Sequence, residues 1–179
     1  MNSSPSSGTV EQLCPRCGLC CDSTLFADVE LRAGDDAARL RELGLPLELK
    51  SEAKRRGCLA FLQPCAGFDG RLCRFYADRP KRCRWFECGL FKRVESGTMT
   101  PSAAGKKIAE AKRRAEQVRA LLRLMGQGNE HQPLAKRYAA AMSAPVDLSD
   151  DAAAERQGEL MLAVNDLMNR LQQDFLQTK

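Results

Sequence analysis

The spacing of apolar positions in the second half of the chain predicts long amphipathic helices. Thr100 and Pro101 resemble an N-cap followed by proline at the first helical position, and Gly126 is a suitable helix stop. Between them, apolar residues recur at alternating spacings of three and four, as they do along one side of a helix. These residues are Ile108, Ala111, Ala115, Val118, Leu122 and Met125. We therefore predict a helix over residues 101–125.

A second apolar stripe predicts a helix over residues 150–176, with Ser149 as its N-cap, and a shorter helix is predicted over residues 132–143. The stripe consists of Leu160, Val164, Leu167, Leu171 and Phe175. We expect the two long helices to pack within one chain as an antiparallel hairpin, with residues 132–143 crossing between them. The alternative is that the stripes form a dimer seam or a partner site. The chain is therefore expected to be a monomer or a weak homodimer.

The first half of the chain is less regular and predicts only short elements. Val29 and Leu31 alternate with charged residues, which is typical of a short strand. Residues 34–44 predict a short amphipathic helix with Leu40 and Leu43 on one face.

Asp69 and Gly70 form a turn signal between Cys65 and Cys73. A two-residue loop would pair the two residues that flank Asp69 and Gly70, and it would place the cysteines on opposite faces. A three-residue loop with a left-handed Gly70 would place them on one face. The second loop is required if both cysteines bind one metal ion.

Cysteine is the residue type that divides the chain. All nine cysteines lie in the first half: Cys14, Cys17, Cys20, Cys21, Cys58, Cys65, Cys73, Cys83 and Cys88. The fold class expected is mainly α, with a small irregular cysteine-rich α+β domain followed by a C-terminal helical hairpin or bundle. The predicted organisation is a flexible N-terminus over 1–13, a metal-binding domain over 14–95 and a helical extension over 100–179.

The cysteines are expected to bind metal rather than to form disulfides. The N-terminus has no secretory signal pattern, and no stretch approaches the roughly 20 apolar residues of a membrane span. We therefore expect a cytoplasmic protein with no membrane contact, where thiols stay reduced. Nine is also an odd number, so disulfides within the chain would leave one thiol over.

The densest group of thiols is the run CPRCGLCC, in which two CxxC steps share Cys17. A CxxC turn lets two sulfurs converge on one ion. Cys20 and Cys21 are adjacent, and their side chains point opposite ways in extended backbone, so we expect them to serve different roles. The spacing Cys14-x₂-Cys17-x₂-Cys20 matches three of the four [4Fe–4S] ligands of bacterial ferredoxins, although the C-x₃-C-P continuation is absent.

The only histidine, His131, lies outside the cysteine region. The ligands are therefore all thiolates, or thiolates with a carboxylate such as Asp22. This donor set suits Zn²⁺ or an iron–sulfur cluster. The spacing of the first cysteines favours a [4Fe–4S] cluster slightly over zinc.

Basic residues concentrate in the middle of the chain. Residues 71–93 hold eight Arg or Lys and two acids, and residues 106–123 hold seven and two. Four arginines lie among the cysteines, where they could offset an anionic metal centre or form a solvated basic face: Arg74, Arg79, Arg82 and Arg84. A basic zinc module that binds nucleic acid is one alternative that this charge allows.

The run CPRCGLCC followed by CAGFDGRLCRFYADRPKRCRWFEC resembles the CxxCxxCC family of zinc- or iron-chelating domains, also called YkgJ-like cysteine-cluster proteins. The resemblance covers about residues 14–90, and the helical half lies outside it. The matching block is Cys65, Cys73, Tyr76, Arg79, Pro80, Cys83, Arg84, Phe86 and Cys88. Either Cys58 or Cys65 can be the family's cysteine, and Cys65 is favoured because it leads into the Asp69–Gly70 turn.

The resemblance implies a metal centre with cysteine ligands and with Arg79 and Arg84 beside it. Pro80 is expected to start the turn that delivers Cys83, and Arg79 to donate to sulfur or to a backbone carbonyl. The candidate ligands are Cys14, Cys17, Cys20, Cys21, Cys65, Cys73, Cys83 and Cys88, enough for two four-ligand sites or for one with spares.

The sequence favours a non-catalytic metal-handling or interaction module over an enzyme. Flagellin lysine N-methylases carry a similar cysteine cluster, which makes an iron–sulfur methyltransferase the enzyme alternative. However, this chain has no GxGxG-type loop for a nucleotide cofactor, no recognised hydrolase or P-loop motif and no predicted catalytic residue. The expected partner is a protein that docks on the helical extension.

Overall fold

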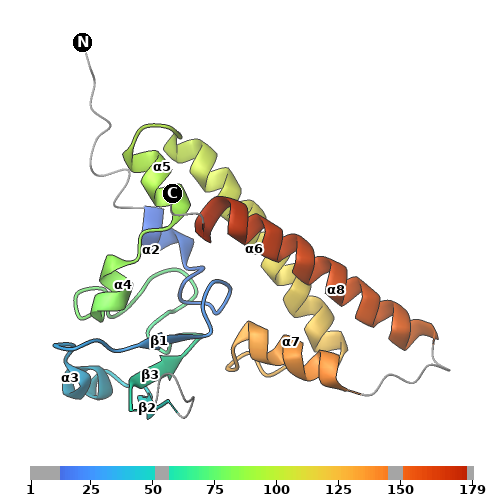
Figure 1. Ribbon diagram of the computed structural model, residues 1–179, viewed down its shortest axis with the longest axis horizontal. Helices are drawn as coiled ribbons and strands as arrows, with labels where there is room; N and C mark the ends of the chain where they lie inside the picture. Colours follow the sequence, from blue (N-terminus) through green and yellow to red (C-terminus); the bar gives the residue numbers. More distant parts are fainter. Residues whose placement is uncertain (1–12, 51–56, 145–150, 177–179) are drawn as a thin grey trace. The chain divides into compact units, whose positions relative to one another are not determined.

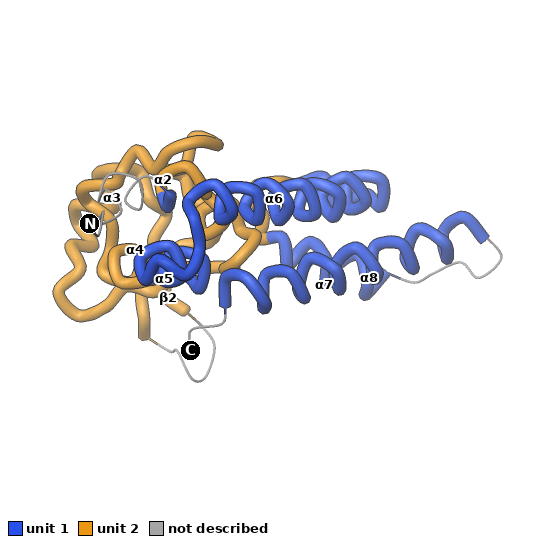
Figure 2. The backbone as a smooth tube through the Cα atoms, turned by 90° about the horizontal axis from the view of Figure 1, so that it is seen from above, with its two compact units in different colours: residues 1–14, 87–129, 134–179 blue, residues 15–86, 130–133 orange. Residues whose placement is uncertain are grey.

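The computed structural model of the protein describes residues 13–50, 57–144 and 151–176. Its fold is mainly α with one small sheet, as the sequence predicts. The chain forms two compact units (Figure 2): residues 15–86 and 130–133 make one, which we call the cysteine unit, and the rest makes the helical unit. No helix in these ranges has the length and apolar character needed to cross a membrane.

A three-stranded antiparallel sheet organises the cysteine unit. The strands are β1 (Asp28–Glu30), β2 (Glu48–Leu49) and β3 (Leu59–Leu62), in the order β1-β3-β2, and Val29 pairs with Phe61. The helices that accompany them are α2 (Leu13–Cys17), α3 (Ala37–Glu42) and α4 (Lys81–Trp85) (Figure 1). The predicted strand and short helix are therefore confirmed.

The core of the cysteine unit is small and apolar. Val29, Leu40, Leu45 and Phe61 are buried at its centre. Partly buried side chains pack around them, and they include two of the cysteines: Leu31, Leu47, Cys65, Phe75 and Cys83. The thiols of Cys65 and Cys83 thus lie at the edge of an apolar core, which limits their contact with water.

The helical unit contains α5 (Gly89–Glu95), α6 (Pro101–Leu124), α7 (Leu134–Ser143), α8 (Asp151–Leu171) and the π-helical turn η1 (Gln172–Leu176). The predicted start of α6 is confirmed, because the Thr100 hydroxyl accepts the N–H of Ala103 at 3.2 Å and Pro101 opens the helix. Gly126, just after α6, has the left-handed φ of 76° that the predicted stop requires. The expected cap Ser149 falls outside the described residues.

Helices α6 and α8 pack against each other (Figure 1), and α7 packs against α6. Lys107 contacts Asp174 while Arg114 contacts Asp166, so the two long helices run antiparallel, as predicted. Both apolar stripes face the packed interior, with two differences at their edges. Met125 and Val164 are only half-buried, whereas Ala104 and Ala163, outside the predicted stripes, are buried.

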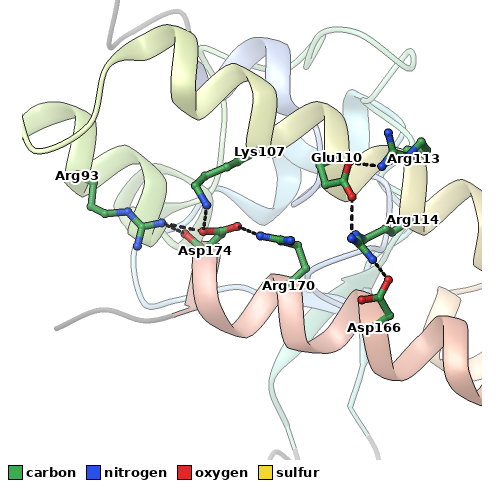
Figure 3. A network of polar contacts seen from close by, with 8 residues as sticks. All are labelled: Arg93, Lys107, Glu110, Arg113, Arg114, Asp166, Arg170 and Asp174. Carbon is green, nitrogen blue, oxygen red and sulfur yellow. Dashed lines mark hydrogen bonds and ion pairs between the residues drawn. The ribbon is translucent and has the colours of Figure 1, made fainter.

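A charged network joins four elements of the helical unit, α5, α6, α8 and η1 (Figure 3). The buried carboxylate of Asp174 accepts from Lys107 at 2.7 Å, from Arg93 at 3.3 Å and from Arg170 at 3.3 Å. One carboxylate therefore holds cations from α5, α6 and α8 together. A buried carboxylate is stable only with such partners.

Candidate metal centre

Three other thiols of the cysteine unit act electrostatically on Cys21: those of Cys65, Cys73 and Cys83. Burial raises the pKa of the Cys21 thiol, and the negative charges of the other three thiolates raise it further. Burial likewise raises the pKa of Cys83 to about 12, with Cys65 and Cys73 as the next contributors. The Cys21 thiolate is therefore disfavoured by burial and by the other three thiolates, and a cation among them would reverse that effect.

Cys21 is positioned by a tight turn that begins at Gly18. The N–H groups of Cys21 and Asp22 both donate to the Gly18 carbonyl, at 2.8 and 3.0 Å. Gly18 has a φ of 75°, and an added Cβ would lie 2.4 Å from Cζ of Phe68. Only glycine combines this left-handed backbone with such close contact to a ring. The N-terminal turn is thus packed directly against the turn that follows Cys65.

Cys65 is joined to Cys21 through the backbone, because its N–H donates to the Cys21 carbonyl at 2.8 Å. Burial raises the pKa of the Cys65 thiol, while N–H groups of Gly67 and Phe68 that face the sulfur act in the opposite direction. N–H groups directed at a sulfur favour its thiolate form, which is the form that binds metal.

Cys73 is brought back toward Cys65 by a compact loop. Asp69 Oδ1 accepts the N–H groups of Arg71 and Leu72, at 2.8 and 2.7 Å. These two bonds lower the pKa of the Asp69 carboxyl. The loop ends in a bridge between Phe68 and Cys73.

Both pairings predicted from the sequence are wrong. Phe68 pairs with Cys73, and the Asp69 N–H donates to the Leu72 carbonyl at 3.2 Å, so the turn lies at Gly70 and Arg71. The Asp69 side chain favours this register because it accepts the N–H groups of Arg71 and Leu72. Gly70 does have the left-handed φ, 92°, that the second option required.

Cys83 lies on α4, which Pro80 introduces. The Cys83 N–H donates to the Pro80 carbonyl at 2.9 Å, and Pro80 occupies the N-cap position with an extended backbone. Asp35 anchors the helix start, because its carboxylate accepts the N–H of Lys81 at 2.8 Å and that of Arg32 at 2.7 Å.

Arg79 and Arg84 hold the backbone that leads into α4. Arg79 donates to the Tyr76 carbonyl at 3.0 Å and lies over the Tyr76 ring at 3.5 Å. Arg84 donates to the carbonyls of Arg79 and of Ala77. Of the two partners predicted for Arg79, the structure thus shows a backbone carbonyl. Its charge still bears on the site, because it lowers the pKa of Cys83 against the effect of burial.

The remaining candidate cysteines lie in other settings. Cys58 is exposed, so the structure groups Cys65, and not Cys58, with Cys21. Cys88 caps α5, where its sulfur accepts the N–H of Phe91 at 3.4 Å. Cys14 is exposed, and Cys17 and Cys20 are half-buried.

The four grouped thiols fit a metal by their chemistry. Within residues 13–50, 57–144 and 151–176, no three His, Cys, Asp or Glu side chains are arranged as a finished ligand set. Four features of this group suit thiolate ligation: the number of donors, the sulfur-only donor set, the partial burial of the thiols and the N–H groups that face the Cys65 sulfur.

Comparison with known families gives one match. The model of the CxxCxxCC family, described as "Putative zinc- or iron-chelating domain", matches residues 13–115, more than half of the chain. The match extends past the predicted limit near residue 90 and into α6. Neither the curated proteins nor the solved structures give a match.

Proposed function

Because the chain belongs to the CxxCxxCC family of zinc- or iron-chelating domains, we propose that it is a non-catalytic metal-handling or interaction module with one centre at Cys21, Cys65, Cys73 and Cys83. The family supports metal binding as such. The choice of these four thiols is our proposal, and it rests on the geometry of the cysteine unit.

The observation that carries the proposal is the grouping of four thiols from three separate stretches of chain. Cys21 is 44 positions from Cys65 along the chain, and Cys83 is 62 positions from Cys21. Specific contacts nevertheless bring the stretches together: the Phe68 ring on Gly18, the Cys65–Cys21 hydrogen bond and the anchoring of α4 by Asp35. Gathering three other partly buried thiols around Cys21, whose pKa their charges raise, makes chemical sense when a cation is to be held among them.

Two metal groups take four thiolates, and each would supply a different property. Zn²⁺ in a Cys₄ site supplies folding free energy and no redox chemistry. A [4Fe–4S] cluster supplies electron transfer. The four grouped thiols suit both. The Cys14-x₂-Cys17-x₂-Cys20 spacing, on which the slight preference for iron–sulfur rests, includes none of these four cysteines and therefore gives no preference at this centre.

Single cysteine variants test the choice of ligands. We expect Cys21→Ser, Cys65→Ser, Cys73→Ser and Cys83→Ser each to abolish stoichiometric metal binding in protein purified without oxygen. Cys58→Ser is the matched control, because Cys58 is exposed and lies outside the group. Equal metal content in Cys73→Ser and Cys58→Ser would refute the proposed ligand set.

A further inference from the structure

A second functional surface lies on residues 71–85 of the cysteine unit. This segment holds six Arg or Lys and a single acid, Asp78. It also holds the chain's one tryptophan and one of its two tyrosines. Trp85 is 69% exposed and Tyr76 is 43% exposed. Tyr and Trp are enriched at binding interfaces because each combines a large apolar ring with a polar group.

Acidic groups of the chain neutralise only part of the positive charge of this segment. Asp78 pairs with Arg39 at 3.5 Å, so it leaves the neighbouring arginines uncompensated. Arg74, Arg79 and Arg84 donate to backbone carbonyls, which are neutral acceptors. The exposed side chain of Arg82 has no hydrogen bond or ion pair among the described residues, whereas the exposed Arg71 acts electrostatically on the Asp69 carboxylate and lowers its pKa. The surface thus carries charge that an anionic ligand can neutralise.

The setting of Trp85 indicates what kind of anion fits. Lys81 lies 5.8 Å from the Trp85 ring centroid, and Arg82 and Arg84 share the short helix α4 with it. Protein–protein interfaces are enriched in aromatic residues and arginine but depleted of lysine, whereas here Lys81 lies over the indole. An exposed ring among cations instead matches surfaces on which bases stack while basic side chains hold phosphates.

We propose that residues 71–85 form a binding surface for single-stranded nucleic acid. Arg71 and Arg82 bind backbone phosphates, and the indole of Trp85 stacks on a base. This function goes beyond metal binding and uses different side chains from the proposed ligands. The metal centre contributes only by holding the segment folded, through Cys73 and Cys83.

Trp85 supplies a direct readout because it is the only tryptophan. The metal-loaded full chain is titrated with oligothymidylate of about 12 nucleotides, within the usual range of single-strand sites. We expect the nucleotide to quench Trp85 fluorescence. The affinity should fall steeply as salt rises from about 50 to about 200 mM. Absence of quenching and of binding at the lower salt concentration would overturn the proposal.

Variants separate the roles of charge and stacking, with binding followed by the anisotropy of a labelled oligonucleotide. We expect Arg71→Ala combined with Arg82→Ala to weaken binding about tenfold or more and to reduce its salt dependence. Trp85→Ala should weaken binding about tenfold, whereas Trp85→Phe should retain most of the affinity. Unchanged affinity in Trp85→Ala would contradict stacking.

Two controls decide whether this surface, and this kind of ligand, is the right one. Arg113 on α6 is a matched basic residue, with a side chain 75% exposed, and Arg113→Ala should bind as the unaltered chain does. Polyglutamate, a polyanion without bases, should bind much more weakly than the oligonucleotide. Equal binding of polyglutamate would instead indicate an acidic protein partner, and a large loss in Arg113→Ala would move the site to α6. Metal content, measured for every variant, should stay unchanged, so that failure here is distinct from failure of the metal centre.

Discussion

The backbone N–H of Cys65 donates to the carbonyl oxygen of Cys21 at 2.8 Å, although 44 positions separate the two residues along the chain. This bond fixes the N-terminal cysteine turn to the loop that carries Cys65 and Cys73. The bond lies in the backbone and therefore does not use either sulfur. Both thiols remain available as metal ligands while the backbone holds them together.

We predict that Gly18→Ala weakens the cysteine unit more than Gly44→Ala does. Both glycines have positive φ, 75° and 87°, so both variants bear the left-handed backbone penalty of about 1–2 kcal/mol. Only at Gly18 would the new Cβ also meet a ring, that of Phe68, and at Gly44 nothing lies within 4 Å. Urea denaturation followed by Trp85 fluorescence measures the difference. Equal losses in the two variants would show that the Phe68 contact is unimportant.

Arg84→Ala should make the metal leave faster. Arg84 holds two carbonyls of the segment that leads into α4, and side chains that support ligands typically change metal affinity about tenfold or more. We expect Arg79→Ala to act in the same direction, because it removes the contact with the Tyr76 carbonyl. Transfer of metal to a chromogenic chelator gives the rate. Arg82→Ala is the control, and a rate for Arg84→Ala equal to that of this control would exclude a supporting role.

The Asp69 turn predicts a dependence of stability on pH. The N–H groups of Leu72 and Arg71 lower the pKa of the Asp69 carboxyl in the folded protein. The carboxylate therefore stabilises the fold fully above the ordinary aspartate pKa of about 3.9, and this contribution is lost as the pH falls through the lowered folded pKa. Wild type should be more stable than Asp69→Asn at neutral pH, and the gap should close in acid. A gap that stays constant from neutral pH to pH about 3 would contradict this origin.

Asp174→Asn should destabilise the helical unit strongly. Asp174 is 4% exposed and meets three cations, so its loss leaves Arg93, Lys107 and Arg170 facing one another without a carboxylate. Breaking such a buried arrangement costs about 3 kcal/mol. Asp166→Asn is the control, since that side chain is 55% exposed and its pair with Arg114 is worth less than about 1 kcal/mol. Thermal melts followed by helical circular dichroism measure both, and equal melting temperatures would refute a central role for Asp174.

The helical unit could be predicted from the sequence because its signals are local. A spacing of three and four residues, a Thr-Pro start and a glycine stop all act within one helix. The burial of Ala163 was not predicted, because a small residue beside an apolar stripe adds little to the hydrophobic pattern. The burial of Asp174 was not predicted either, because a buried carboxylate becomes stable only through cations that arrive from other helices.

In the cysteine unit, the sequence predicts the candidate ligands but not how tertiary contacts arrange them. The sequence identifies the candidate cysteines, and it favours Cys65 over Cys58 through the turn that follows Cys65. It does not reveal which four come together, because that depends on tertiary contacts such as the Phe68 ring on Gly18 and the Asp35 carboxylate on α4. The pairing of Phe68 with Cys73 was mispredicted for a related reason, since the Asp69 side chain binds the N–H groups of Arg71 and Leu72 and shifts the turn to Gly70 and Arg71.

The most direct test of the metal centre is elemental analysis combined with an absorption spectrum of the full chain purified without oxygen. We predict at least one zinc ion in a colourless protein, or about four iron and four sulfide per chain in a brown one. Removal of the metal by a chelator should abolish the cooperative melt of the cysteine unit, as followed by Trp85 fluorescence. Protein that contains neither metal when freshly purified, or that melts identically after chelation, would contradict the account.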